Sequence, residues 1–221
     1  MLALTPRATA ALIIDDFSVA TASYPVIANN GSPVSTVDDT GLPGPFPFKR
    51  TRVLRTGGGG TVVFEVDTFG GIAGLSSTFN ASGSVVLQYT TAELSATSFP
   101  PTSVPSNPVF EIDFLFFDLP TGEPLQIDVF LFDGSTLIAG TTSVSDPIAF
   151  VPTTIQVPLV SDPSFDADSV EGATIAFTGT TGTDFAITEI RLVPEPASLA
   201  LLALGTAALT VRVRRDRPEP A

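Results

Sequence analysis

The stretch FEIDFLFF, residues 110–117, carries the pattern that decides the fold. Apolar and polar side chains alternate along it, as expected of a β-strand that buries one face. Its apolar face comprises Phe110, Ile112, Phe114 and Phe116, and its polar face comprises Glu111 and Asp113. We therefore expect a strand here whose phenylalanines lie in a hydrophobic core.

The same pattern recurs along the chain, and no convincing amphipathic helix interrupts it between Leu12 and Leu192. Short runs rich in Val, Ile, Phe and Thr are bounded by Gly, Pro, Asn and Asp, which favours strands joined by turns. About nine strands are expected, at 12–17, 50–56, 61–67, 84–90, 110–117, 126–132, 154–159, 173–178 and 185–192. This spacing predicts an all-β fold, an antiparallel β-sandwich of jelly-roll type.

Turn residues predict how some strands are joined. The segment LPTGEP, residues 119–124, separates two strong strands, so residues 110–117 and 126–132 are expected to pair as an antiparallel hairpin. Asp133-Gly134 indicates a second tight turn, and the four glycines at 57–60 indicate a third.

Composition excludes several function classes. The chain has 221 residues, no His and no Cys, and a net charge of −13. Without His or Cys there is no thiol nucleophile, no Ser–His–Asp triad and no ordinary zinc site. Nucleic-acid binding needs a basic face, which this charge argues against. We expect no catalytic residues, and a protein that is not an enzyme.

Paired carboxylates are the remaining means of catalysis. A glycosidase needs two of them in one cleft, and Glu65, Glu111, Asp113 and Asp128 lie on expected strands. The preferred interpretation is that they mark the solvent face of alternating strands. There is no Trp to stack on sugars, which leaves Tyr24 and Tyr89. A carbohydrate-binding or carboxylate-dependent carbohydrate-active domain is the alternative function.

One acidic loop is a candidate calcium site, and calcium is the only cofactor that the sequence suggests. It contains Asp162, Asp166, Asp168 and Glu171. Calcium takes six to eight oxygen ligands, but no EF-hand spacing is present here. The preferred interpretation is therefore solvated loop acids and no metal.

Basic residues are strongly segregated. Between Thr56 and Ile190 there are sixteen acids and no Lys or Arg. The basic group of the body comprises Lys49, Arg50, Arg52 and Arg55. On a strand, Arg50 and Arg52 share a face. They offer a docking site for an acidic exopolysaccharide or, as we prefer, pair with the excess of acids.

The C-terminal segment is apolar and then basic. Residues 197–211, ASLALLALGTAALTV, carry no charge, and as a helix they span roughly 22 Å of a bilayer core of about 30 Å. The expected membrane contacts are Ala197, Leu199, Leu201, Leu202, Leu204, Leu209 and Val211. The expected cytoplasmic anchor is Arg212, Arg214, Arg215 and Arg217, as the positive-inside rule predicts. The alternative is a buried C-terminal helix of the globular domain.

The residues before that segment are Pro194-Glu195-Pro196, where neither proline can lie inside a helix or a central strand. This tripeptide, followed by an apolar stretch and an Arg-rich end, resembles the PEP-CTERM sorting signal of Gram-negative-type bacteria that make exopolysaccharide. The resemblance implies an exosortase, a membrane-embedded processing enzyme, as partner. It also implies an exported protein of the cell envelope, the membrane or the extracellular matrix.

Some features of the body look loosely like those of other PEP-CTERM proteins. They are the opening Ile14-Asp15-Asp16-Phe17, the Arg-bearing strand Arg50-Thr51-Arg52, and a strand that runs straight into Val193-Pro194-Glu195-Pro196. They imply no ligand and no activity.

The chain divides into three parts. Ala8-Thr9-Ala10 resembles an A-x-A cleavage site, so residues 1–10 are expected to be the remnant of a signal peptide. No apolar region of ordinary length precedes it, and the alternative is that residues 12–14 simply open the first strand. Residues 11–192 form the expected sandwich, and residues 193–221 the sorting tail. The body is expected to be non-enzymatic, with an adhesive or structural role.

Overall fold

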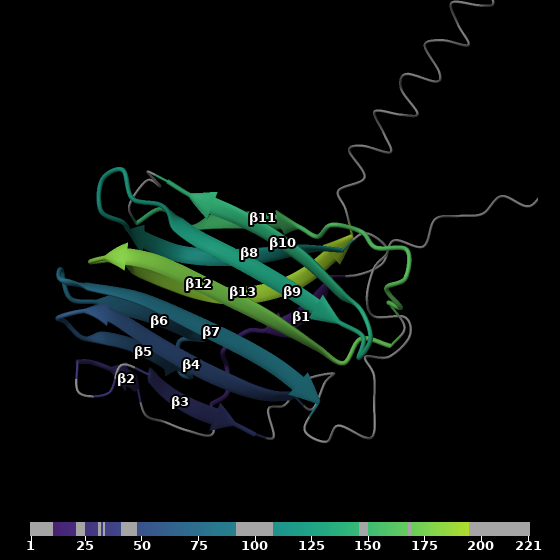
Figure 1. Cartoon of the computed structure of the whole chain (residues 1–221), viewed down its shortest axis with the longest axis horizontal. Helices are drawn as coiled ribbons and strands as arrows, with labels where there is room; N and C mark the ends of the chain where they lie inside the picture. The colour runs from purple at the N-terminus through teal and green to yellow at the C-terminus, as the bar shows by residue number, and fades with distance from the viewer. Residues whose placement is uncertain are drawn as a thin grey trace, which may run out of the picture.

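The computed structural model describes residues 11–20, 25–30, 32, 34–40, 48–91, 108–145, 150–167 and 169–194. Within these ranges the chain is all-β and forms thirteen strands (Figure 1). They are β1 (Leu12–Asp15), β2 (Val26–Ala28), β3 (Val34–Asp39), β4 (Phe48–Gly58), β5 (Val62–Asp67), β6 (Ile72–Ser77), β7 (Ala81–Thr91), β8 (Pro108–Asp118), β9 (Leu125–Phe132), β10 (Leu137–Val144), β11 (Thr153–Pro158), β12 (Gly172–Thr181) and β13 (Asp184–Pro194).

The strands form two antiparallel sheets, which confirms the expected sandwich. A seven-stranded sheet has the order β11-β8-β13-β6-β5-β2, with β1 also paired to β13. A six-stranded sheet has the order β10-β9-β12-β7-β4-β3. Figure 1 shows the two sheets as overlapping layers. Most strands direct alternate side chains between the layers, where these side chains form one hydrophobic core.

Phenylalanines fill the middle of this core, as the sequence predicts. Phe114 stacks on Phe117 with ring centroids 4.1 Å apart, and both rings are buried. Phe177 of β12 and Phe185 of β13 join them, with centroids 5.1 Å apart. Burying each such ring contributes on the order of 1.5–3 kcal/mol, so the core stabilises the fold without disulfides.

A β-bulge in β8 changes which side chains of residues 110–117 face the core. Phe114 lies opposite Ile187 and Phe116 lies opposite Ala186, so Leu115 is an extra residue on β8. The extra residue reverses the alternation beyond it. Phe117 consequently points into the core, and Phe116, expected there, is half-buried on the outer face.

The predicted hairpin between residues 110–117 and 126–132 is wrong. β8 pairs with β11 and β13, whereas β9 pairs with β10 and β12 in the other sheet. Both strands have an apolar inner face, and crossing between the sheets lets these faces meet across the core. The predicted turn at Asp133-Gly134 is confirmed, because β9 and β10 are consecutive paired strands and Gly134 has a φ of +83°.

The predicted tail begins where the described chain ends. β13 reaches Pro194, which lies opposite Pro108 in register, two residues beyond the expected boundary at 192. Residues 1–10 and 195–221, with the expected signal remnant and hydrophobic helix, lie outside the described residues. In the described part of the chain there is no helix of the length and apolarity that a bilayer requires.

Candidate functional site

Two arginines on β4 form a buried charge cluster with two aspartates. Arg50 and Arg52 are fully buried, although both were candidates for contact with polysaccharide. Arg50 Nη1 donates to Asp15 Oδ2 at 2.6 Å, and Arg50 Nε lies 3.0 Å from Asp39 Oδ2. Arg52 Nε lies 3.0 Å from the same Asp39 oxygen. These four residues are called the buried arginine cluster below.

Neighbouring residues complete this cluster. The Tyr89 hydroxyl donates to Asp15 Oδ2 at 2.9 Å, and Arg50 Nη2 donates to the carbonyl of Val19 at 2.9 Å. Phe17, with a φ of +54°, donates its N–H to Asp15 Oδ1, and its ring centroid lies 5.6 Å from the Arg50 guanidinium carbon. The structure thus brings together two of the features of the body noted in the sequence, the opening IDDF and the RTR strand.

Burial and ion pairing act in opposite directions on the charges of this cluster. Burial by itself lowers the pKa of the Arg50 guanidinium, but Asp15, with Tyr89 and Asp39, more than offsets this and raises that pKa. Burial raises the pKa of the Tyr89 hydroxyl well above its usual value, so it remains a donor. The preferred interpretation, that Arg50 and Arg52 pair with acids, is confirmed. Because Arg50, Arg52 and Tyr89 are all buried, the alternatives of polysaccharide docking and sugar stacking do not apply to these residues.

A second arginine cluster lies on the outer face of the seven-stranded sheet. Arg191 Nε donates to Glu111 Oε2 at 2.8 Å, and its Nη1 donates to Asp113 Oδ2 and to Glu189 Oε1. The Arg191 side chain is 22% exposed. Thr154 on β11 donates to Asp113 as well. Arg191, Glu111, Asp113 and Glu189 are called the outer arginine cluster below.

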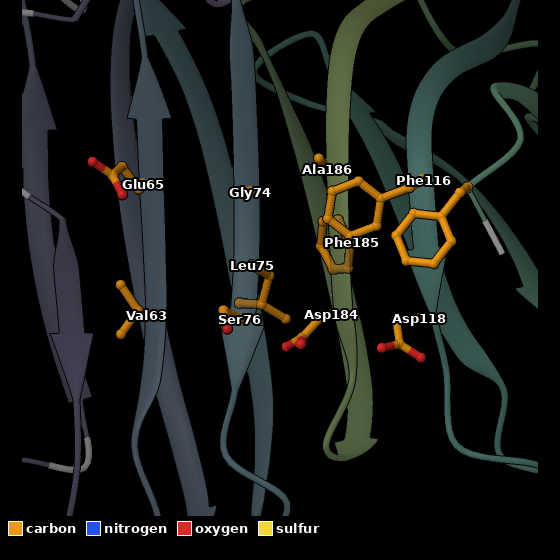
Figure 2. A pocket seen from close by; sticks show the side chains of 11 residues that line it. Val63, Glu65, Gly74, Leu75, Ser76, Phe116, Asp118, Asp184, Phe185 and Ala186 are labelled. Carbon is orange, nitrogen blue, oxygen red and sulfur yellow. The ribbon is translucent and has the colours of Figure 1, made fainter.

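The same outer face carries a groove across β5, β6, β13 and β8, which encloses about 410 Å³. Glu65, Gly74, Ala186 and Phe116 lie directly opposite one another on the four strands and form one row across the sheet. Figure 2 shows this row, with the carboxylate at one end and the aromatic ring at the other. The four strands span about 14 Å at ordinary strand spacing. The two small residues between the ends make a low floor.

A second row runs parallel to the first. Val63 lies opposite Ser76, and Asp184 lies opposite Asp118. Figure 2 shows the two aspartates next to each other on neighbouring strands. Asp184 Oδ1 accepts the backbone N–H of Ser77 at 2.7 Å. The groove therefore has an acidic end on this side.

Stacked aromatic rings form one wall of the groove. Phe150 stacks on Phe116 with ring centroids 5.9 Å apart and an interplanar angle of 29°. Phe150 is 74% exposed. Sequence reasoning missed both rings, because the four residues FLFF at 114–117 do not reveal the bulge and Phe150 lies outside any expected strand.

The carboxylates that the sequence offered for catalysis are not gathered in one cleft. Glu111 and Asp113 are bound by Arg191, and Glu65 lies on β5 at the far end of the groove. Asp128 lies on β9 of the other sheet, where Gln126 donates to it.

The candidate calcium loop uses its carboxylates for its own turns. Asp162 Oδ1 accepts the N–H and the hydroxyl of Ser164, and Asp166 Oδ2 accepts the hydroxyl of Ser169. Among the described residues, no three acidic side chains gather as a metal site, and Asp168 lies outside them. Glu171 lies instead near Gly134 of the β9–β10 turn.

The predicted sorting residues are mostly beyond the described part of the chain. Pro194 ends β13, while Glu195 and Pro196 lie outside the described residues. So do the expected membrane contacts from Ala197 to Val211 and the arginines from 212 to 217. Their roles stay predictions.

Comparison with solved structures finds general likenesses. A family 11 carbohydrate-binding module of a Clostridium thermocellum cellulase is 12% identical with a TM-score of 0.36, covering 85% of this chain and 96% of that chain. The xylan-binding domain from family 22 of these modules is 11% identical with a TM-score of 0.32, covering 86% and 97%. PfGH50B is 9% identical with a TM-score of 0.39, covering 65% of this chain, which spans only 22% of the length of that protein. At these TM-scores the likeness gives no information on a ligand.

No curated protein matches the chain. A family model does match its end: the PEP-CTERM protein-sorting motif aligns with residues 192–215. That range contains the tripeptide 194–196, the apolar segment and the first arginines after it. The chain therefore carries a PEP-CTERM sorting motif, which confirms the resemblance seen in its sequence and implies an exported protein associated with the cell envelope.

Proposed function

We propose that this chain is an exported, non-enzymatic β-sandwich with an adhesive or structural role, processed at its C-terminal motif by an exosortase-type membrane enzyme. The observation that carries the proposal is the sorting motif at residues 192–215. The apolar segment serves as a transient membrane stop, and the mature sandwich is released into the extracellular matrix.

The position of the motif supports processing without loss of the fold. Leu192 is buried in the core, and β13 pairs with β8, β6 and β1. Its last pair joins Pro194 and Pro108, two residues without backbone donors. Cleavage beyond Pro194 leaves every described strand in place, so the sandwich can persist after the tail is removed.

The state of the carboxylates supports a non-enzymatic body. Glycoside hydrolysis needs one carboxyl group with a raised pKa and a second one nearby in a cleft. Arg191 binds Glu111 and Asp113, and Asp128 lies on the other sheet. For these three acids, the arrangement fits surface acids on alternating strands better than a catalytic pair.

The sorting proposal is tested by following a C-terminal tag in a host that has an exosortase. The wild type is expected to lose the tag, and Glu195→Ala is expected to keep it. Glu219→Ala is the matched control, because Pro218-Glu219-Pro220 repeats the tripeptide without an apolar segment after it. Retention of the tag by the wild-type protein in membranes would show a lasting anchor instead.

Carbohydrate binding is a second candidate function, and the groove on the seven-stranded sheet favours it. The exposed ring of Phe150, stacked on the half-buried Phe116 beside carboxylates, matches the apolar and polar faces of a sugar ring. A glycan array combined with hydrolysis assays separates binding from catalysis: binding without turnover is expected.

A further inference from the structure

We propose that the groove on the outer face of the seven-stranded sheet binds a glycan whose sugar rings carry free amino groups. This inference rests on the second candidate function, carbohydrate binding, and is independent of the sorting of the chain. It names the class of glycan.

The aromatic wall is held in place by an unusual backbone conformation. Phe150 has a φ of +61°, a region that a bulky side chain rarely adopts and that costs on the order of 1–3 kcal/mol. Its ring nevertheless remains 74% exposed while it stacks on Phe116. The bulge at Leu115 turns Phe116 outward to meet it. Two independent backbone irregularities thus build one exposed aromatic surface.

The charges of the groove select the ligand. Its lining contains Glu65, Asp118 and Asp184 and, among the described residues, no Lys or Arg. Acidic polysaccharides are therefore repelled, and a protonated amine is attracted. An ammonium group near the face of Phe150 or Phe116 gains a further cation–π attraction. Amino sugars combine such a group with an apolar ring face.

The floor of the groove suits a flat ring. Gly74 and Ala186 lie opposite each other between Glu65 and Phe116, so the first row is low over its two middle strands. An oligosaccharide of several rings lying across the four strands can reach the carboxylate at one end and the aromatic ring at the other.

A basic peptide is the competing ligand, and the topology disfavours it. Peptides commonly bind sheets by adding a strand at a free edge. The groove lies on the face of β5, β6, β13 and β8, each of which has a neighbouring strand on both sides, with β2 covering β5 at residues 62–64. A peptide main chain lying across this face would find few backbone partners, and its polar groups would lose hydrogen bonds to water.

The test is calorimetric titration of the purified protein with a hexamer of β-1,4-linked glucosamine. The titration is run at about pH 5.5, where the amines of the sugar are protonated. Phe150→Ala and Asp118→Asn are each expected to weaken binding about tenfold. The controls are Phe79→Ala, which removes a ring that is 87% exposed elsewhere, and Glu123→Gln, which removes an exposed loop charge. Both controls are expected to bind like the wild type.

A blocking variant covers the case in which Phe150→Ala disturbs the fold. A Cβ at Gly74 would meet only the Phe185 carbonyl oxygen, at an ordinary contact distance of 3.5 Å. Gly74→Val therefore fits the strand, which favours β-branched residues, and raises the floor of the groove. We expect it to abolish binding while the melting temperature does not fall.

Three outcomes would overturn the inference. One is equal or tighter binding of the fully N-acetylated hexamer, which would leave carbohydrate binding standing without the role of the amine. Another is equal weakening by the control variants, which would show attraction to the acidic protein as a whole. A third is binding of an oligolysine peptide but not of the sugar. None of these affects processing at Glu195, so failure here is distinguishable from failure of the sorting proposal.

Discussion

The two arginine clusters use the same chemistry in opposite surroundings. In the buried arginine cluster, Arg50 binds Asp15 and Asp39 with no exposed side-chain surface of its own. In the outer arginine cluster, Arg191 binds three carboxylates but remains 22% exposed. If one partner is removed by mutation, water can reach the remaining charges of the outer arginine cluster but not those of the buried arginine cluster. Similar ion pairs therefore contribute differently to stability according to their burial.

The location of each cluster follows from this difference. The buried arginine cluster joins β1, the chain before β2, and β3 and β4, so it fixes the N-terminal part of the chain to both sheets. The outer arginine cluster joins only β8 and β13, which are already paired. We therefore expect the buried arginine cluster to determine whether the N-terminal strand docks. The outer arginine cluster is expected to have a smaller effect on stability.

Replacing Arg50 gives the largest expected effect. Arg50→Met leaves two buried carboxylates facing one fewer cation, and the free energy of unfolding is expected to fall by about 3–5 kcal/mol. Urea unfolding followed by circular dichroism measures it. Arg55→Met, an exposed residue on the same strand, is the control and should change stability by less than about 0.5 kcal/mol. A small effect of Arg50→Met would mean that water enters the cluster.

Removing the Tyr89 hydroxyl tests the edge of the same cluster. Tyr89→Phe keeps the buried ring but deletes its hydrogen bond to Asp15, which still has Arg50 and the Phe17 N–H as partners. We expect a loss of about 1–2 kcal/mol in the same unfolding assay. A double-mutant cycle with Asp15→Asn should show that the two changes are not additive, and simple additivity would argue against the contact.

The outer arginine cluster should respond less, and in a salt-dependent way. Arg191→Met leaves three neighbouring carboxylates to repel one another through partly screened solvent. A loss of about 1 kcal/mol is expected at low salt, shrinking as ionic strength rises. Unfolding measured at low and at about 1 M salt checks this. An effect independent of salt would place the cluster in a drier environment than its exposure implies.

The smallest effect is expected from Asp133, a loop carboxylate that accepts hydrogen bonds from backbone N–H groups. The backbone N–H of Asp166, with those of Thr136 and Ser135, lowers the pKa of Asp133 to about 2. Its stabilising contribution is therefore present above about pH 4 and is lost as the pH falls toward 2. Asp133→Asn should lower the free energy of unfolding by about 1 kcal/mol or less at neutral pH. It should also reduce the dependence of that free energy on pH between about 4 and 2. Unfolding curves between about pH 2 and 6 measure it, and an unchanged pH dependence would exclude the role of Asp133.

The sequence predicts the sandwich well where strands are strongly patterned. Phe110, Ile112 and Phe114 alternate with acids, and the expected buried face is confirmed. The strands it missed are β2, β3, β6 and β10. In β6 and β10, Gly, Ala and Ser interrupt the alternation of large apolar residues, and β2 has only three residues. Sheet neighbours rather than local propensity create such strands.

The candidate groove could not be derived from the sequence. It depends on the extra residue Leu115, which only pairing with β13 reveals, and on the registers that align Glu65 with Phe116 across four strands. For the buried arginine cluster, the sequence predicted the kind of interaction but not the partners. Pairing of Arg50 and Arg52 with acids was the preferred interpretation, but their partners Asp15 and Asp39 are fixed by long-range packing. The sorting motif needed no fold at all, because its signal is local and linear.

The most direct test of the account is the mass of the mature protein isolated from a host with an exosortase and from the same host without one. We expect a species that ends near residues 194–196 and lacks residues 197–221 only when the enzyme is present, and the same unfolding transition of the sandwich in both hosts. A protein that extends to Ala221 in both hosts would contradict the claim that the C-terminal motif directs processing.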